Sequence, residues 1–272
     1  MAERRRFTAL VLAGSRGAAD PVAFAAGVSH KALAPVGGIP MLQRVLDALS
    51  TSASIRRIVV QTNDPAIVAG LPKLQRAVTM GEIEILPTAA SPAQSVSAAI
   101  ARLSGDLPLL VTTADHALLT PELVDDFCRR VPVGDKDGAD IAVALAAGST
   151  VLAKYPGALR TFYKLGGERY SGCNLFALLT PQAKQAIDFW VALEQHRKKP
   201  WRLIAAIGLR PLLLYLTGRL DLTRAMAELS RIVGVHGEAV VMLQPEAPID
   251  VDKPEDLVLA EKILAGRSSS SF

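Results

Sequence analysis

The strongest constraint on the fold is the alternation of short apolar runs with segments of helical periodicity. Residues 7–13 are continuously apolar, which is typical of a parallel strand buried on both faces. Residues 40–50 then repeat leucine and valine at helical spacing. Further strand-like runs cover 55–62, 83–87, 107–113, 141–145 and 239–243, and helix-like runs cover 95–103, 121–130, 181–196 and 254–264. This alternation predicts the α/β class, with a mostly parallel Rossmann-like sheet flanked by helices.

Chain length and the change of pattern along the chain predict one domain in three parts. The 272 residues fit a single large α/β domain spanning residues 1–272. The regular alternation extends to about residue 145. It loosens over about 146–238, where the glycines and tyrosines of 154–172 indicate loops within an irregular and helical insertion. A closing strand and helix are expected over 239–265.

Charge and composition argue against a nucleic-acid-binding protein. The net charge of +4 and the sequence pI of about 9.2 are mildly basic, which is compatible with anionic small molecules. Aromatic residues make up 5% of the chain and are not interleaved with a basic run, so a stacking platform for single strands is not expected. The expected partners are therefore small molecules rather than nucleic acid.

The cysteines and the first residues predict a cytoplasmic protein. Cys128 and Cys173 lie 45 positions apart and lack zinc-ligand spacing, so two reduced thiols are expected. The apolar run at 7–12 follows three arginines, as in a signal peptide, but it continues into Ala13 and Gly14 without a plausible cleavage site. We interpret this run as the first buried strand.

The most apolar stretch of the chain lies within residues 200–219. Arg202, Arg210 and Pro211 interrupt it, so a membrane-spanning helix is not expected. One interpretation is a helical hairpin buried on the sheet or in an oligomer contact. The other is contact with a membrane surface, because leucines, arginines and two aromatic residues are mixed here as they are in interfacial helices.

A turn of small residues follows the first strand. Residues 12–17, of sequence LAGSRG, end the strand, and Lys31 lies beyond them. Backbone N–H groups in such a turn can approach phosphates closely, and a lysine can offset their charge. The spacing fits neither a Walker loop nor a dinucleotide-binding fingerprint. Taken alone, the segment is also explained as an ordinary turn.

Two acidic segments are candidate metal sites. Asp115 follows the strand at 107–113, and ligands of open α/β sheets collect at the carboxyl ends of strands. In the phrase 250–257, Asp250 and Asp252 are two residues apart, so in an extended segment one or both could complete a site with Asp115. Carboxylates suit Mg²⁺, which prefers oxygen ligands. The structural alternatives are a turn cap at Asp115 and a helix cap within 250–257.

Together, in this order, these segments resemble the MobA-like nucleotidyltransferases, which have the GT-A fold. The resemblance covers roughly residues 7–145 and 239–264. It rests on Leu12-Ala13-Gly14 with the later Lys31, on the phrase 35–42 (PVGGIPML), on Asp115 ahead of Thr120-Pro121, and on Asp252 within the D-x-D-x-P-E-D-L phrase.

The resemblance implies a site and a reaction. It implies transfer of a nucleotidyl group from a nucleoside triphosphate to a phosphorylated acceptor, such as a sugar, alditol, cofactor or lipid head group, with Mg²⁺ as cofactor and pyrophosphate as product. The implied metal ligands are Asp115 and Asp252, and the implied catalytic residues are Lys31 and Arg16. The implied nucleotide-binding residues are Leu12, Ala13, Gly14, Ser15, Gly17, Gln94 and Ser95. The acceptor is expected to bind within 146–238.

The sequence departs from the family pattern in the phosphate-binding turn. Ser15 stands where the family usually has a second glycine, and Ala19 stands where it has an arginine. Arg16 is the candidate substitute for that arginine. The segment between Gly17 and Lys31 is also long and rich in alanine. An unusual geometry around the triphosphate is therefore expected.

Two other functions remain open from the sequence. A glycosyltransferase of the same fold typically carries D-x-D at the metal strand, whereas His116 and Ala117 follow Asp115 here. A non-catalytic protein that binds nucleotides or a membrane surface is the second alternative, supported by 200–219. His116 is expected to be structural.

Overall fold

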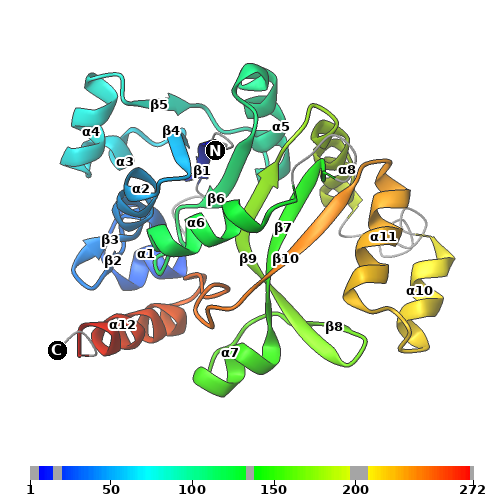
Figure 1. The fold of residues 1–272 in the computed structure, drawn as a ribbon. Coiled ribbons are helices and arrows are strands. Elements are labelled where there is room, and N and C mark those ends of the chain that lie inside the picture. The colour runs from blue at the N-terminus through cyan, green and yellow to red at the C-terminus, as the bar shows by residue number, and fades with distance from the viewer. Residues whose placement is uncertain (1–5, 15–19, 133–137, 197–207, 270–272) are drawn as a thin grey trace.

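The computed structural model describes residues 6–14, 20–132, 138–196 and 208–269. At its centre is a sheet with the strand order β10-β7-β9-β6-β1-β4-β5, and β8 pairs with β9 (Figure 1). The strands are β1 (Phe7–Leu12), β4 (Ile55–Gln61), β5 (Ile83–Leu86), β6 (Leu109–Thr113), β7 (Ile141–Ala147), β8 (Tyr163–Leu165), β9 (Glu168–Leu178) and β10 (Gly237–Met242). Along this order β9 is antiparallel to β6 and β7, while the other neighbouring pairs are parallel. The predicted α/β class with a mostly parallel sheet is confirmed.

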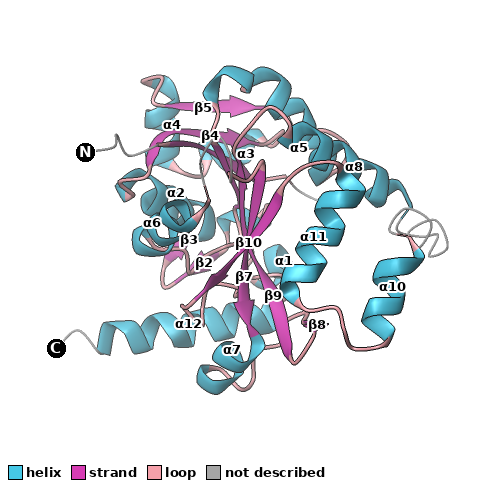
Figure 2. Cartoon of the chain, turned by 45° about the vertical axis from the view of Figure 1, so that its right-hand side comes forward, coloured by secondary structure: helices cyan, strands magenta, loops and turns pink. Residues whose placement is uncertain are grey.

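Helices flank this sheet on both faces (Figure 2). The described α-helices are α1 (Pro21–Ala25), α2 (Met41–Thr51), α3 (Pro65–Ala69), α4 (Pro72–Thr79), α5 (Pro92–Arg102), α6 (Pro121–Arg130), α7 (Gly148–Lys154), α8 (Ala183–His196), α10 (Leu209–Leu216), α11 (Leu222–Val233) and α12 (Pro254–Ser269). Two short 3-10 turns, η1 (Lys31–Leu33) and η2 (Ser104–Asp106), and a small ribbon of β2 (Pro35–Val36) and β3 (Ile39–Pro40) complete the described elements.

Several helices begin where a side-chain cap is followed by proline. The capping side chain accepts a hydrogen bond from the backbone of the first helical turn, and the fixed φ of proline suits the first position. The capping residues of α1, α3, α5 and α6 are Asp20, Asp64, Ser91 and Thr120. The helix expected over 121–130, with Thr120 as its cap, is therefore confirmed.

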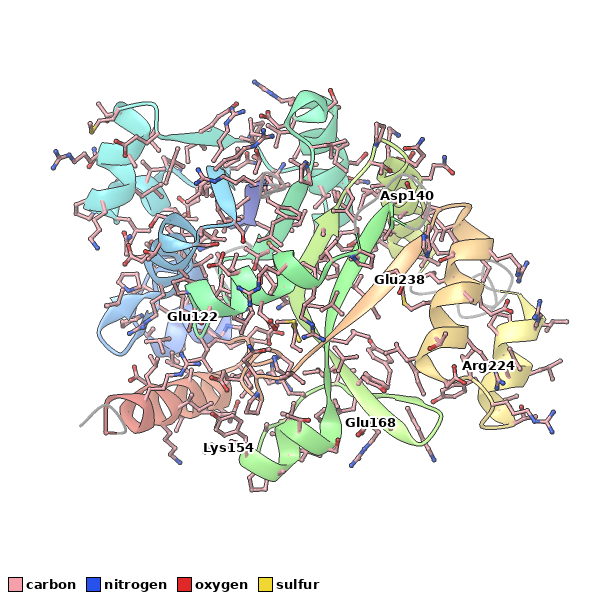
Figure 3. All side chains as sticks on the ribbon, viewed as in Figure 1. Glu122, Asp140, Lys154, Glu168, Arg224 and Glu238 are labelled. Carbon is pink, nitrogen blue, oxygen red and sulfur yellow. The ribbon has the colours of Figure 1, made fainter. Side chains whose placement is uncertain are left out.

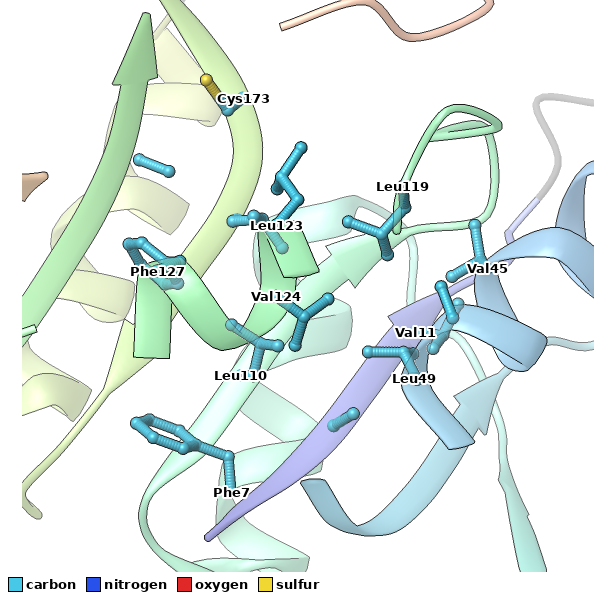
Figure 4. Close-up of a cluster of buried hydrophobic side chains, with 14 of the residues drawn as sticks. Phe7, Val11, Val45, Leu49, Leu110, Leu119, Leu123, Val124, Phe127 and Cys173 are labelled. Carbon is cyan, nitrogen blue, oxygen red and sulfur yellow. The ribbon is translucent and has the colours of Figure 1, made fainter. Parts of the chain in front are cut away.

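Alternate residues of β1 point to opposite faces of the sheet and enter two separate cores. Phe7 and Val11 pack with α2 and α6, where Leu49 and Phe127 are among the buried residues (Figure 4). Leu10 points the other way, into the core beneath α5 and α8. This burial on both faces explains why the run over 7–13 shows no polar alternation.

A third hydrophobic cluster joins segments that are distant in sequence. Ala117 and Leu118, from the loop after β6, are buried with Ile249 and Val251, from the segment before α12. Val22 of α1 lies in the same cluster. Because alternate residues of 249–252 face this cluster, the intervening aspartates are directed elsewhere. The cluster thus holds both acidic segments at one end of the sheet.

The loops expected over 154–172 are present over 155–162, and the expectation is wrong for 163–172. Residues 163–172 include β8 and the first half of β9, which form an antiparallel hairpin with Gly166 at its turn in a left-handed conformation (φ 64°). β9 then crosses the middle of the sheet. Opposite an irregularity in β7, Asn174 takes a φ of 50°, which is uncommon for a residue other than glycine. Gly166, Gly167 and Gly172 therefore belong to a strand pair, while Gly157 lies in the loop before it.

The stretch 200–219 is described only from residue 208 onward, and residues 200–207 lie outside the described residues. Residues 209–216 form α10, which lies beyond α11 and away from the sheet (Figures 1 and 2). The expectation of a hairpin buried on the sheet is thus wrong for this part of the stretch. No helix within the described ranges is long and apolar enough to cross a bilayer.

Candidate active site

The ammonium group of Lys31 joins the two aspartates that were predicted to bind a metal. Its Nζ lies 2.6 Å from Oδ2 of Asp115 and 2.7 Å from Oδ1 of Asp252. The side chains of Lys31 and Asp115 are 17% and 19% exposed, and that of Asp252 is 57% exposed. The two carboxylates, which are far apart in sequence, therefore converge on one cation at a partly open site.

Lys31 occupies this position because a short turn presents it there. It is the first residue of η1, and the preceding His30 caps the turn. Nδ1 of His30 accepts a hydrogen bond of 3.0 Å from the backbone N–H of Ala32. The imidazole is buried, so the turn is anchored in the protein interior. A buried cap thus fixes the backbone that carries the lysine.

Hydrogen bonds to both the side chain and the backbone of Asp115 fix its orientation. Oδ1 accepts a hydrogen bond of 2.5 Å from the hydroxyl of Thr113, which leaves Oδ2 to contact Lys31. The carbonyl oxygen of Asp115 accepts a 3.1 Å hydrogen bond from the backbone N–H of Val251. This last bond connects the loop after β6 directly to the segment that carries Asp252.

The backbone of Asp252 is held by a carboxylate in the first turn of α12. Oδ2 of Asp256 accepts hydrogen bonds from the N–H groups of Asp252 and Lys253, at 3.1 and 3.0 Å. The N–H of Asp256 donates in return to the carbonyl of Lys253, at 3.0 Å. This reciprocal arrangement satisfies N–H groups at the start of the helix. It also fixes the position of the Asp252 backbone, from which the side chain extends.

A buried arginine holds the same segment from the other side. The guanidinium of Arg160 pairs with Oδ1 of Asp250 and with Oδ1 of Asp256, the latter at 2.6 Å. It also donates to the carbonyls of Pro248 and Asp250, at 3.4 and 3.2 Å. The planar fork of an arginine can satisfy several acceptors at once. Arg160 therefore fixes the course of residues 248–256.

Asp250 belongs to this structural network, in contrast to Asp252. Its Oδ1 pairs with Arg160, and its Oδ2 accepts a hydrogen bond from the side-chain amide of Asn174. Burial, reinforced by the negative charges of Asp115 and Asp252, raises the pKa of Asp250 to about 6, although Arg160 opposes this shift. Of the two aspartates considered for the metal, only Asp252 shares the Lys31 contact with Asp115.

Lys31 and His116 differ in their ionisation state at neutral pH. Burial lowers the pKa of Lys31, but the two aspartates more than offset this effect, so the pKa is raised overall. The lysine thus remains a cation at neutral pH. Burial lowers the pKa of His116 to about 4, so its imidazole is neutral. A neutral, buried imidazole agrees with the structural role expected for His116.

The first strand ends beside the site. The N–H of Ala13 donates to the carbonyl of Gln61 at 2.9 Å, and the carbonyl of Leu12 accepts from the N–H of Ala114 at 2.9 Å. Ala13 is therefore engaged in the sheet, and Gly14 is the first exposed residue of the turn. The other predicted phosphate-contacting residues, Ser15, Arg16 and Gly17, lie outside the described residues.

The loop after β5, which leads to the predicted nucleotide-binding residues Gln94 and Ser95, is held by side chains that follow β4 or end it. The side-chain amide of Asn63 pairs with both backbone groups of Thr88, at 2.9 Å to the N–H and 3.2 Å to the carbonyl. Nε2 of Gln61 donates to the carbonyl of Pro87 at 2.9 Å. A Cβ placed on Gly14 would lie 3.4 Å from the side chain of Thr88, so the turn after β1 is adjacent to this loop.

Gln94 and Ser95 lie in the first turn of α5, next to the same loop. The hydroxyl of Ser95 is buried and accepts a 2.8 Å hydrogen bond from the N–H of Ala89. The side chain of Gln94 is half-buried. The structure therefore gives Ser95 a contact that fixes the loop, and the roles of both residues in nucleotide binding stay predictions.

The donor set at Asp115 and Asp252 fits a magnesium ion. Both carboxylates direct an oxygen at one cation, and Mg²⁺ is usually held by one or two carboxylates together with substrate phosphates and water. No group of three or more His, Cys, Asp or Glu residues is arranged to hold a metal anywhere in the described part of the chain. The remaining ligands of such an ion would therefore come from substrate and water.

The sequence did not point to Arg160, to Asn174 or to Asn63, whose side-chain amide binds the backbone of Thr88. Arg160 lies in a segment with no motif, and its partners are 90 and 96 residues away. Asn174 follows two small residues in β9, of which only the part up to Gly172 was expected to be a loop. Asp256 could have been found from the sequence, because it lies within 250–257 at a position typical of a helix cap.

Comparisons with known proteins agree with this geometry. Residues 9–232 match the family described as MobA-like NTP transferase domain. A solved structure from Thermus thermophilus, titled a hypothetical transferase, is 30% identical with a TM-score of 0.76, and the match covers 93% of this chain and 99% of that chain. No match was found among curated protein sequences.

More distant structures share the fold. The structure of CMP:2-keto-3-deoxy-manno-octonic acid synthetase complexed with CTP is 14% identical, with a TM-score of 0.51. That of 4-diphosphocytidyl-2C-methyl-D-erythritol synthase is 12% identical, with a TM-score of 0.56. Each comparison covers 97% of this chain and 100% of the other.

The family match covers most of the chain and includes Lys31 and Asp115, whereas Asp252 lies beyond its last residue. It favours nucleotidyl transfer over the two alternatives left open by the sequence, glycosyl transfer and non-catalytic binding. The chain belongs to the MobA-like NTP transferase family and is a nucleotidyltransferase.

Proposed function

We propose that this enzyme transfers a nucleoside monophosphate from a nucleoside triphosphate to a phosphorylated acceptor, with Mg²⁺ as cofactor and pyrophosphate as product. The acceptor class is a sugar, alditol, cofactor or lipid head-group phosphate. The observation that carries the proposal is the convergence of Asp115 and Asp252 on the ammonium of Lys31. Two carboxylates and one lysine at the end of a parallel sheet supply what a triphosphate and a divalent cation need.

The reaction is an exchange of phosphate bonds. A phosphate oxygen of the acceptor attacks the α-phosphorus of the triphosphate. The bond between that phosphorus and the oxygen bridging to the β-phosphate breaks, and its electrons leave with pyrophosphate. Such a transfer depends on positioning and on charge stabilisation rather than on a covalent contribution from the protein. Magnesium supplies Lewis-acid neutralisation of the phosphate oxygens when it is bound.

Each residue of the site has one task in this reaction. Asp115 and Asp252 hold the metal, and Lys31 leaves the carboxylates to contact phosphate oxygens, where its charge offsets that of the leaving group. Gly14 and the rest of the 12–17 turn, with Arg16, contact the triphosphate. The acceptor binds on the side formed by residues 146–238.

The nucleobase is assigned to the loop after β5 and to the start of α5. Gln94 presents an amide that can both donate to and accept from a base edge. The contacts of Gln61, Asn63 and Ser95 with the loop support this assignment, because a preorganised surface discriminates ligands with little ordering cost. CTP is the first nucleotide to test, since related structures are titled by CTP or by a diphosphocytidyl product.

Thermal unfolding in the presence of nucleotides tests the donor half of the proposal without knowledge of the acceptor. CTP, GTP, UTP and ATP are each compared with and without Mg²⁺. A ligand at a hundred times its dissociation constant adds about 2.7 kcal/mol to the unfolding free energy, which gives a clear shift. We expect one nucleotide to stabilise the protein strongly, and only with Mg²⁺.

A second experiment tests catalysis. The stabilising nucleotide is incubated with Mg²⁺ and a panel of phosphorylated sugars, alditols and lipid head groups, and pyrophosphate release is measured. Release that depends on one acceptor class supports the proposal. No stabilisation by any of the four nucleotides, or turnover of sugar nucleotides in place of triphosphates, would overturn it.

A further inference from the structure

Gly172 lies in the middle of the sheet and is nevertheless exposed. It belongs to β9, which runs between β7 and β6, and its register partner on β7 is Leu145. Further along β9, Leu175, Ala177 and Leu178 are buried, as is expected of a central strand. The exposure of Gly172 shows that one face of the sheet is open at this position.

Neither the backbone nor the packing around position 172 requires a glycine. The φ of Gly172 lies outside the left-handed region that favours glycine. A Cβ placed on it would meet no heavy atom of the described residues within 4 Å. Glycine inside a strand weakens the strand, and it commonly marks a place where a ligand or another backbone approaches closely. Since no described part of the chain fills this space, it is available to a ligand.

This opening is at the same end of the sheet as the candidate active site. Glu168, at the start of β9, and Asp140, just ahead of β7, mark opposite ends of the sheet (Figure 3). Because β9 is antiparallel to β6, the first residues of β9 lie at the carboxyl end of β6. The loop that carries Asp115 follows this end of β6.

The strand itself connects Gly172 to the acidic residues. The pairing of β9 with β6 ends at Leu175, so Gly172 lies beyond the end of β6, where the chain turns towards Asp115. Asn174, between these two residues of β9, donates a hydrogen bond from its side-chain amide to Oδ2 of Asp250. Gly172 is therefore two residues from a side chain that contacts the segment of the second predicted metal ligand.

Apolar and aromatic side chains border the opening. Leu145 lies opposite Gly172, and Tyr170 lies two residues before it, so both share its face of the sheet. Tyr163 pairs with Tyr170 across the β8–β9 hairpin and is 63% exposed. This border offers apolar contacts and two hydroxyl groups, which suits the carbon skeleton of a ligand better than its phosphate.

The position of β9 in the sheet favours the acceptor over the nucleotide as this ligand. The predicted nucleotide-binding residues Gly14 and Gln94 follow β1 and β5. In the strand order, β6 separates both of these strands from β9. A nucleotide over β1 and β5 with its phosphates at Asp115 leaves the β9 side of the metal site to the acceptor.

We propose that the acceptor lies against the backbone of β9 at Gly172, so that the missing side chain determines how large an acceptor the site admits. The proposal rests on the transferase activity proposed above and adds a specificity-determining residue to it. The attacking phosphate reaches the metal between Asp115 and Asp252, and the carbon skeleton extends over Gly172 towards Tyr170.

Graded substitution of Gly172 tests the proposal. Gly172→Ala and Gly172→Val are assayed by pyrophosphate release with glucose 1-phosphate, glycerol 3-phosphate, flavin mononucleotide and phosphocholine, one acceptor from each class. For the acceptor that the wild type uses best, we expect the KM to rise roughly tenfold or more in Gly172→Val and less in Gly172→Ala, because the added methyl groups occupy its space. The KM for the nucleotide is expected to stay unchanged in both variants.

Gly105→Val is the matched control. Gly105 lies in η2, ahead of β6 at the opposite end of the sheet, and a Cβ there also meets no described heavy atom within 4 Å. We expect this variant to keep the wild-type KM for both substrates. Equal thermal unfolding of all four proteins, and an equal shift on addition of nucleotide with Mg²⁺, shows that the fold and the nucleotide site are retained.

The possible failures are distinguishable. An active wild type with an unchanged acceptor KM in Gly172→Val overturns this inference and leaves the transferase activity standing. A KM for the nucleotide that rises as much as the KM for the acceptor also overturns it, because the opening would then belong to the nucleotide. A wild type without acceptor-dependent pyrophosphate release overturns the proposed function, and the role of Gly172 falls with it.

Discussion

Nζ of Lys31 lies 2.6 Å from Oδ2 of Asp115. We assign the lysine to phosphate and the aspartate to the metal, so this ion pair joins two groups that must separate when substrate binds. In this state the ammonium neutralises carboxylates that would otherwise repel each other. If these assignments hold, binding of nucleotide and metal exchanges one cation for another at the same pair of carboxylate oxygens.

Substitution of Lys31 is expected to impair turnover strongly. Lys31→Gln removes the charge that offsets the leaving pyrophosphate, and loss of one such contact costs roughly 100-fold or more in rate. Pyrophosphate release at saturating nucleotide measures the effect. Lys73→Gln, at an exposed lysine paired with Asp47, is the matched control and should retain wild-type turnover.

The same variant should respond more strongly to magnesium than the wild type. Without the ammonium of Lys31, Mg²⁺ reaches Oδ2 of Asp115 and Oδ1 of Asp252 without displacing that lysine, so it is expected to stabilise the variant more. Thermal unfolding with increasing Mg²⁺ and no nucleotide measures this difference. A magnesium-induced shift in Lys31→Gln that is no larger than in the wild type would show that lysine and metal do not compete.

Asp115→Ala is expected to abolish turnover and leave the fold intact. Asp115 is partly exposed, and the core beneath it is formed by apolar neighbours such as Leu118, so the loop remains packed. Glu122→Ala on α6 is a control with the same change of charge. Activity above a tenth of the wild type in Asp115→Ala would reject the assignment of this residue to the metal site.

The sequence predicted the strands that are buried on both faces. β1 and β6 have helices above and below them, so their sequences are continuously apolar and easily identified. β9 is equally central, but it carries Gly172 and the left-handed Asn174. Small residues and an irregular register broke the apolar pattern, and the conformation of Asn174 depends on tertiary contacts that no local pattern encodes.

In the candidate site, too, some residues could be predicted from the sequence and others could not. Lys31, Asp115 and Asp252 were named from the sequence because each follows a recognisable local feature, and the structure brings them together. Arg160 has no such feature, since its function depends on partners about ninety residues away. Side chains that orient a site from behind act through long-range packing, which sequence spacing does not reveal.

Arg160 is expected to be essential for stability. Arg160→Ala leaves the buried Asp250 and Asp256 without their cation, and breaking a buried ion pair in this way costs about 3–5 kcal/mol. Denaturant unfolding measures the loss. Arg129→Ala, at an exposed arginine of α6, is the control, with an expected change below about 1 kcal/mol.

Arg160→Lys tests whether the planar shape of the arginine side chain matters in addition to its charge. Lysine keeps the positive charge but lacks the planar fork, so it cannot contact both carboxylates and the backbone carbonyls together. We expect a smaller loss of stability than in Arg160→Ala, but a higher Mg²⁺ concentration for half-maximal turnover, because the backbone of Asp252 is less firmly held. An unchanged magnesium requirement would limit Arg160 to a structural role.

Acid is expected to destabilise the turn that carries Lys31. Burial and the charge of Lys31 lower the pKa of His30 below 6.5, and Asp64 and Asp20 offset this only in part. Below pH 6.5 the unfolded chain therefore binds a proton that the folded protein excludes, so the unfolding free energy falls as the pH decreases through this range. Protonation also prevents Nδ1 from accepting the hydrogen bond of Ala32.

The variant His30→Asn tests this mechanism. Its amide oxygen can accept from Ala32, but the side chain does not titrate, so the difference in unfolding free energy between pH 7.5 and pH 5.5 should be smaller than in the wild type. His236→Asn, at a half-exposed histidine, should retain the wild-type difference. If all three proteins lose the same stability between the two pH values, His30 is not the group that makes the fold sensitive to acid.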